Sequence, residues 1–159
     1  FCHSALTCGS ESIHNYNVIF RRATINEASR LLHLKMRPDT PQNYEFIRLE
    51  DIKGNVKRLL HVKPWTQFFD LEGEKEIKFS TANNITFKNI EMYCETDFEI
   101  ESSDQYALSD FTFENLKITT LNPSIENAKF IKKLKIKNVD IKKVNSEKKI
   151  YPEKDHSEM

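Results

Sequence analysis

A short apolar pattern recurs five times along this chain of 159 residues. The five copies occupy residues 17–25, 46–54, 84–92, 110–118 and 133–141. Within a copy, apolar residues are separated by two positions, then three, then two, as in Ile85, Phe87, Ile90 and Met92. Because a strand alternates its side chains between two faces, the three-residue step indicates a bend after which a second short strand continues on the same core.

A polar or charged residue occupies the three-residue step of every copy. These corner residues are Arg22, Asp51, Asn89, Asn115 and Asn138. Repeats of this size with an inward polar residue at one bend are typical of a solenoid wound from strands. The sequence therefore predicts an all-β fold, a parallel β-helix.

We predict that the corner asparagines face inward and form a ladder. A buried amide is costly unless it is hydrogen-bonded, and asparagine carries both donors and an acceptor. Stacked at the strand spacing of about 4.8 Å, each side chain can bond the one above and the one below. The alternative is an ordinary sheet with asparagines in its turns.

Other segments complete the predicted coils. Partner strands are expected at residues 31–36, 58–62, 98–101 and 128–131. The segment 63–80 widens one interval between repeats, so we expect a loop or side hairpin there, on the face where repeat proteins place binding insertions. The repeats define one domain over residues 1–141, and the charged residues 142–159 form a tail that we expect to be solvated or disordered.

The net charge, the apolar runs and the cysteines of the chain limit the kinds of partner and cofactor that we expect. The net charge is zero, which gives no indication of a nucleic acid or membrane partner, and no apolar run approaches the roughly 20 residues of a membrane span. Cys2, Cys8 and Cys94 are an odd number without metal-binding spacing, so we expect buried free thiols, no metal and no cofactor. The chain begins inside a predicted strand, and we interpret it as part of a longer protein whose exposed N-terminal strand edge favours self-association.

A short row of basic residues is the first candidate site. If Leu32 and Leu34 face the core, His33, Lys35 and Arg37 face outward on one edge. Such a row can hold a carboxylate through a bidentate arginine or the point charge of a lysine. A solvated charged face is the alternative interpretation.

An aromatic group in segment 63–80 is the second candidate site. Trp65, Phe68 and Phe69 could stack against the apolar face of a sugar ring. Aromatic side chains more often bury their large surface internally, so we expect one of the two phenylalanines to join the core.

The residues around His3 resemble a known family. The segment 3–11, HSALTCGSE, is similar to the Gly-His-Gly segment of glycoside hydrolase family 28, the polygalacturonases, which many bacterial members follow with Gly-Ser-Glu. Residues 30–35 fall where that family carries its Arg-Ile-Lys motif. The phrases LKMRPDTPQNYEFI and VKPWTQFFDL also resemble bacterial members. The resemblance implies a right-handed parallel β-helix of the pectin-lyase-like kind, of which this chain is a C-terminal part, truncated on its N-terminal side.

The resemblance also implies a function. It implies a secreted enzyme, periplasmic or extracellular, that hydrolyses α-1,4-galacturonide links of a pectic cell-wall polysaccharide or oligogalacturonide with inversion. Inverting hydrolysis needs two carboxyl groups about 6.5–9.5 Å apart. By the resemblance, His3 would lie near those carboxyl groups as a catalytic residue that orients them, and Lys35 would hold the sugar carboxylate, with His33, Arg37 and Trp65 as further substrate-binding residues.

The chain departs from the family pattern at several positions. Cys2 and Ser4 stand where the family has glycines around the histidine, and His33 replaces the arginine of Arg-Ile-Lys. Arg37 is the candidate to supply the missing guanidinium. The family's aspartate motifs would precede Phe1, and no Asp-Asp pair occurs in this chain, so we expect the chain alone to be inactive.

Two alternatives remain open. A carbohydrate-binding or adhesive β-helix without catalysis would fit the missing aspartates. A β-helix lyase or esterase would need other motifs, which the sequence does not contain.

Overall fold

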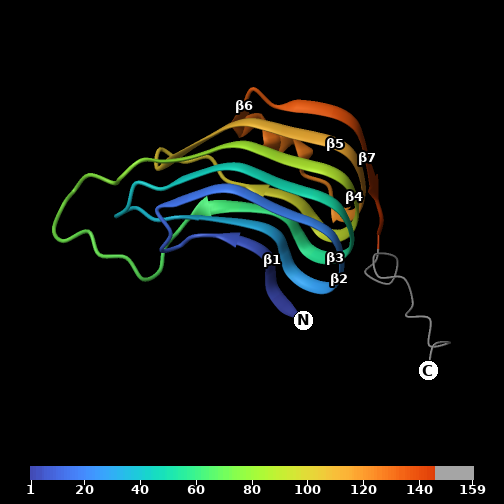
Figure 1. Ribbon diagram of the computed structural model, residues 1–159, viewed down its shortest axis with the longest axis horizontal. Helices are drawn as coiled ribbons and strands as arrows, with labels where there is room; N and C mark the ends of the chain where they lie inside the picture. Colours follow the sequence, from blue (N-terminus) through green and yellow to red (C-terminus); the bar gives the residue numbers. More distant parts are fainter. Residues whose placement is uncertain (146–159) are drawn as a thin grey trace.

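The computed structural model describes residues 1–145 and is all-β apart from one short 3₁₀ helix. Within these residues seven strands form a single parallel sheet, in which β1 to β5 follow one another in chain order and both β6 and β7 pair with β5. Figure 1 shows the strands stacked as curved, nearly parallel ribbons. The elements are β1 (Cys2–Cys8), β2 (His14–Met36), β3 (Asn43–Pro64), β4 (Ser80–Ile100), β5 (Tyr106–Asn122), η1 (Ile125–Phe130), β6 (Ile131–Lys132) and β7 (Lys135–Lys143).

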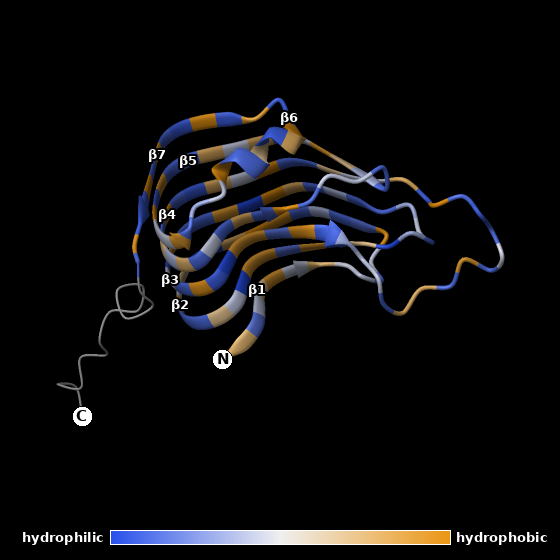
Figure 2. Cartoon of the chain, turned by 180° about the vertical axis from the view of Figure 1, so that it is seen from behind, coloured by the Kyte–Doolittle hydropathy of each residue, from blue (hydrophilic) through white to orange (hydrophobic). Residues whose placement is uncertain are grey.

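The predicted repeats lie directly over one another. In the register, Leu49 pairs with Phe87, Phe87 with Phe113, and Phe113 with Ile136. The apolar positions of β3 to β5 are buried, and Phe113 stacks on Phe98 at 4.9 Å between ring centroids. Figure 2 shows the resulting alternation of hydrophobic and hydrophilic bands along these strands. The prediction of parallel strands stacked through the 2-3-2 pattern is therefore confirmed.

The corner residues form a ladder, but on the outside of the stack. Asn89 donates to Asp51 at 3.0 Å, Asn115 donates to Asn89 at 3.0 Å, and Asn138 donates to Asn115 at 2.7 Å. All of these residues are exposed, so the prediction that they face inward is wrong. Each corner residue has a φ of 53° to 55°.

The left-handed backbone explains the outward corner. Asparagine and aspartate enter this conformation more readily than other non-glycine residues. One left-handed residue lets two consecutive side chains point outward, which produces the three-residue step without a polar group in the core. A second row of left-handed residues lies five positions earlier in each copy. Its members are Asn17, Phe46, Asn84, Asp110 and Lys133.

The last predicted partner strand is mostly helical. Residues 128–131 were expected to be extended, but η1 covers Ile125–Phe130 and only Ile131 and Lys132 form β6. The buried Asp97 explains the change, because its carboxylate accepts hydrogen bonds from the backbone N–H of Phe98 and of Ser124 at 2.8 Å and 2.6 Å. Proline at position 123 also removes a backbone donor that a strand would use.

The loop predicted at residues 63–80 is present but spans 65–79, because β3 extends to Pro64 and β4 begins at Ser80. Figure 1 shows it extending away from the stack between β3 and β4. Its Phe68 is 82% exposed and its Phe69 is 38% exposed, so the expectation that one of them joins the core is wrong. β7 continues to Lys143, two residues into the predicted tail, and residues 146–159 of that tail lie outside the described residues. In residues 1–145, no helix is long and apolar enough to cross a membrane.

The cysteines are free thiols. Cys8 and Cys94 are buried, as expected, whereas Cys2 is exposed. Burial raises the pKa of both buried thiols to about 12, which makes them poor nucleophiles at neutral pH.

Candidate functional site

A cavity of about 500 Å³ lies against the outward faces of β1, β2 and β3, where the loop after β3 adds a wall. Its lining is rich in basic and polar side chains. The lining residues are His3, Ser4, Thr7, Arg30, His33, Lys35, His61, Lys63, Pro64, Trp65, Thr66 and Gln67.

Two copies of one short sequence build the basic part of this cavity. Residues 30–35 read RLLHLK and residues 58–63 read RLLHVK. The parallel register pairs Arg30 with Arg58, His33 with His61 and Lys35 with Lys63. The leucines and valine of both copies are buried in the core, so each strand presents the same outward triad of arginine, histidine and lysine. We call Arg30, His33 and Lys35 the first triad, and Arg58, His61 and Lys63 the second triad.

Glu99 of β4 neutralises part of the second triad. It lies in register with His61, whose Nδ1 is 2.5 Å from Glu99 Oε2. Lys63 Nζ is 3.1 Å from Glu99 Oε1, and Arg58 also forms an ion pair with this carboxylate. Burial raises the pKa of Glu99, but the hydrogen bond from Lys63 and the charges of the second triad outweigh burial and lower it. One carboxylate thus occupies the three basic groups of the second triad.

Both histidines are neutral at physiological pH. Burial, followed by the charges of neighbouring basic groups, lowers the pKa of His33 to about 2. Burial also lowers the pKa of His61 to about 4, against the opposing effect of Glu99. The two rings contact each other edge to face with centroids 4.6 Å apart. The positive charge of the cavity is therefore carried by its arginines and lysines.

Lys35 is held in place by three neighbours. Its Nζ lies 4.4 Å from the centre of the Trp65 ring, a cation–π contact. Its backbone carbonyl accepts a hydrogen bond of 2.5 Å from the Tyr44 hydroxyl. Gly9, at a φ of +91°, passes so close that an added Cβ would lie 2.3 Å from the same carbonyl oxygen. Burial and the charge of Arg30 lower the pKa of Lys35.

Several polar atoms of the cavity lack partners. Five buried side-chain polar atoms have no hydrogen-bond partner within residues 1–145, and three of them belong to lining residues of this cavity: Arg30 Nε, His33 Nδ1 and Trp65 Nε1. Buried polar groups are normally paired, and these three atoms have no protein partner within the described residues.

The structure brings together four of the five residues predicted for the site. His3, His33, Lys35 and Trp65 all line the cavity, although His33 is only 5% exposed and does not belong to an open row. Arg37 does not join them. Its guanidinium makes two hydrogen bonds to Asp39, at 2.8 Å and 2.6 Å, because β2 ends at Met36 and the chain turns away.

Sequence reasoning did not single out Arg30, the second triad or Glu99 as site residues. A visible signal was available, since the near-identical hexapeptides at 30–35 and 58–63 stand at the same phase of neighbouring repeats. Glu99 could have been found only through the register that aligns it with His61.

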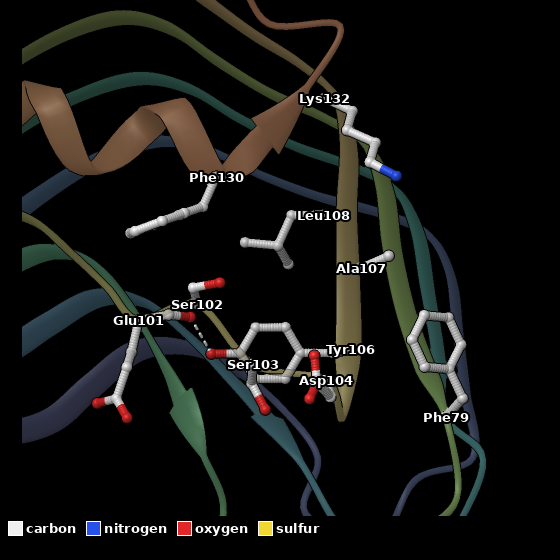
Figure 3. A pocket seen from close by; sticks show the side chains of 10 residues that line it. All are labelled: Phe79, Glu101, Ser102, Ser103, Asp104, Tyr106, Ala107, Leu108, Phe130 and Lys132. Carbon is white, nitrogen blue, oxygen red and sulfur yellow. Dashed lines mark hydrogen bonds between the residues drawn. The ribbon is translucent and has the colours of Figure 1, made fainter.

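A second hollow, of about 330 Å³, has a different character (Figure 3). Its lining mixes exposed aromatic rings with the acidic side chains of Glu101 and Asp104. The Tyr106 hydroxyl donates to the backbone carbonyl of Glu101. None of the unpaired buried atoms found in residues 1–145 belongs to this lining, so the basic cavity is the stronger candidate site.

The basic side chains and the Trp65 ring of the cavity suit a ligand that carries both a negative charge and an apolar surface. Among residues 1–145, no carboxylate lines the cavity and no cluster of metal-ligating side chains is found. No protein-family model, curated protein or solved structure matches the chain.

Proposed function

We propose that the basic cavity binds the carboxylate of a uronic sugar, and that the chain forms one wall of the substrate cleft in a pectin-degrading glycoside hydrolase of the polygalacturonase kind. In this proposal the parallel sheet is part of a right-handed parallel β-helix. The observation that carries it is the pair of cationic side chains in the first triad: Arg30 and Lys35 both line the cavity, and Lys35 Nζ lies over the indole ring of Trp65. The sequence resemblance, which matches the same segments, adds the galacturonide.

The chemistry of the cavity fits such a ligand. Arginine and lysine bind carboxylates through charge-assisted hydrogen bonds, and the apolar face of a pyranose ring packs against aromatic rings. Lys35 and Trp65 offer both features side by side, because the lysine lies over the indole. His3 lies at the exposed rim, where the proposal has it facing the catalytic carboxyl groups of the complete cleft.

A second candidate function is carbohydrate binding without catalysis. It is favoured by the scarcity of free carboxylates at the cavity: within residues 1–145 none lines it, and Glu99 is paired with the second triad. Both candidates predict that the chain binds an oligogalacturonate, and they differ in whether a glycosidic bond is cleaved. Both place the protein in the periplasm or outside the cell.

Calorimetric titration with trigalacturonate tests the shared prediction. We expect binding to the free acid and at least about tenfold weaker binding to the fully methyl-esterified trisaccharide, since one charge-assisted hydrogen bond contributes about 1.5–3 kcal/mol. Lys35→Met should lower the affinity for the free acid to a similar extent. Equal affinity for acid and ester would refute the proposed carboxylate site.

Two control variants separate the site from general charge effects. Lys53→Met removes an exposed lysine of β3 outside the cavity, and Arg37→Met removes a guanidinium that is paired with Asp39. Neither should change the affinity by more than about twofold. Reducing-sugar release from polygalacturonate then distinguishes the hydrolase from the binding protein.

A further inference from the structure

The two triads have the same composition but different surroundings. The second triad contacts the Glu99 carboxylate through all three of its side chains. In the first triad, Arg30 Nε and His33 Nδ1 are buried without a hydrogen-bond partner in residues 1–145. Within residues 1–145, the second triad is therefore filled by a carboxylate, whereas the first triad forms no ion pair with one.

The register explains why only one copy is filled. His61 has Glu99 beside it on the next strand, whereas His33 has His61 on one side and Thr7 on the other. Neither neighbour can supply a negative charge, because threonine is uncharged and histidine is either neutral or positive. The filled copy shows that this triad, at this spacing on a parallel sheet, can hold one carboxylate.

We propose that Glu99 is a built-in carboxylate that fills the second of two equivalent anion positions, so that the cavity accepts one ligand carboxylate at a time, at the first triad. A second carboxylate on the adjacent sugar would meet the charge of Glu99 one strand away, at about 4.8 Å. The inference rests on the proposed function and deepens it. The preferred substrate class is a pectic chain whose free carboxylates are separated by neutral or esterified sugars.

Glu99→Gln tests this specificity directly. The probes are trigalacturonate with three free carboxylates and the same trisaccharide with one free carboxylate and two methyl esters, titrated at one fixed ionic strength. The unaltered chain should bind the singly charged probe at least as tightly as the fully charged one. In Glu99→Gln the second triad becomes available, and the affinity ratio should shift by about tenfold or more towards the fully charged probe.

Glu95→Gln is the matched control, because it removes a carboxylate from the same strand outside the cavity lining. Its affinity ratio should equal that of the unaltered chain. A tenfold preference of the unaltered chain for the fully charged probe, unchanged in Glu99→Gln, would overturn the inference while leaving the proposed function intact. A folded chain that binds neither probe would overturn both.

A second comparison applies if Glu99→Gln does not fold. Lys35 and Lys63 are equivalent positions of the two triads, but only Lys63 is paired with Glu99. Lys35→Met should weaken binding of the singly charged probe by about tenfold or more, and Lys63→Met should weaken it much less. Equal losses of affinity in the two variants would show that Glu99 does not prevent the second triad from binding the ligand carboxylate, and would overturn the inference.

Discussion

Replacing Asn115 by leucine tests the corner ladder, in which the corner residues of successive repeats are hydrogen-bonded to one another. Asn115 has a φ of 53°, donates to Asn89 at 3.0 Å and accepts from Asn138 at 2.7 Å. The left-handed conformation costs an ordinary residue about 1–2 kcal/mol. Two exposed amide hydrogen bonds add about 0.5–1 kcal/mol each, at the low end of the usual range.

The expected loss is therefore about 2–4 kcal/mol in the free energy of unfolding. For a chain of this size, that corresponds to a fall of about 5–15 °C in Tm. Urea denaturation monitored by circular dichroism measures the free energy, and an unchanged m-value would show that only stability has changed.

Asn84→Leu is the matched control. Asn84 is exposed and has a φ of 53°, but its side chain bonds the neighbouring Asn83 rather than the next strand. It should show the backbone cost with little of the ladder term, so Asn115→Leu should be about 1 kcal/mol more destabilising. Equal losses would mean that the ladder adds nothing, and no loss in either variant would refute the backbone argument as well.

The remaining predictions concern the cavity. Gly9→Ala should lower both Tm and the affinity for trigalacturonate, because the new Cβ would meet the Lys35 carbonyl oxygen at 2.3 Å. Gly54→Ala, with a similar clash against another backbone segment, should lower Tm alone, and unchanged affinity in Gly9→Ala would contradict our account of how Lys35 is positioned. The pKa values of His33 and His61 are about 2 and about 4 in the folded chain, against about 6.5 in an unfolded one. Between pH 6.5 and 4 the unfolded chain therefore binds more protons, so the free energy of unfolding should fall as the pH falls. His33→Gln should flatten that slope by up to about 1.4 kcal/mol per pH unit, and an identical slope in the variant would show that His33 is not held neutral.

The stacking of the strands could be predicted from sequence because it depends on a local pattern that repeats. Apolar residues at the same phase, such as Phe87 and Phe113, must lie over one another if each strand pairs in parallel with the next. The direction of the corner residues could not be predicted in the same way. A three-residue step is compatible either with one polar residue turned inward or with two consecutive residues turned outward, and only the backbone conformation at Asn89 decides between them.

The helical segment η1 was missed for a different reason. Its position depends on Asp97, which is 27 residues away from Ser124 in sequence and reaches it across the stack. The same limit applies to Phe68 and Phe69, whose exposure follows from the path of the loop rather than from their own hydrophobicity.

Only part of the candidate site could be predicted from the sequence: the duplicated triad is visible there, but the neighbours of each copy are not. Neighbouring strands carry equivalent positions, so a side chain that occurs at the same position of two repeats, as His33 and His61 do, produces two adjacent copies of the same chemical group. Sequence can reveal that duplication. It cannot reveal that the two copies have different neighbours, because the difference comes from which residue the next strand places beside them. Glu99 lies beside His61 and Thr7 lies beside His33, so within residues 1–145 the second triad contacts a carboxylate and the first triad does not. In a stack of parallel strands, the copy of a basic triad that has no carboxylate beside it is therefore the position where we expect an anionic ligand to bind.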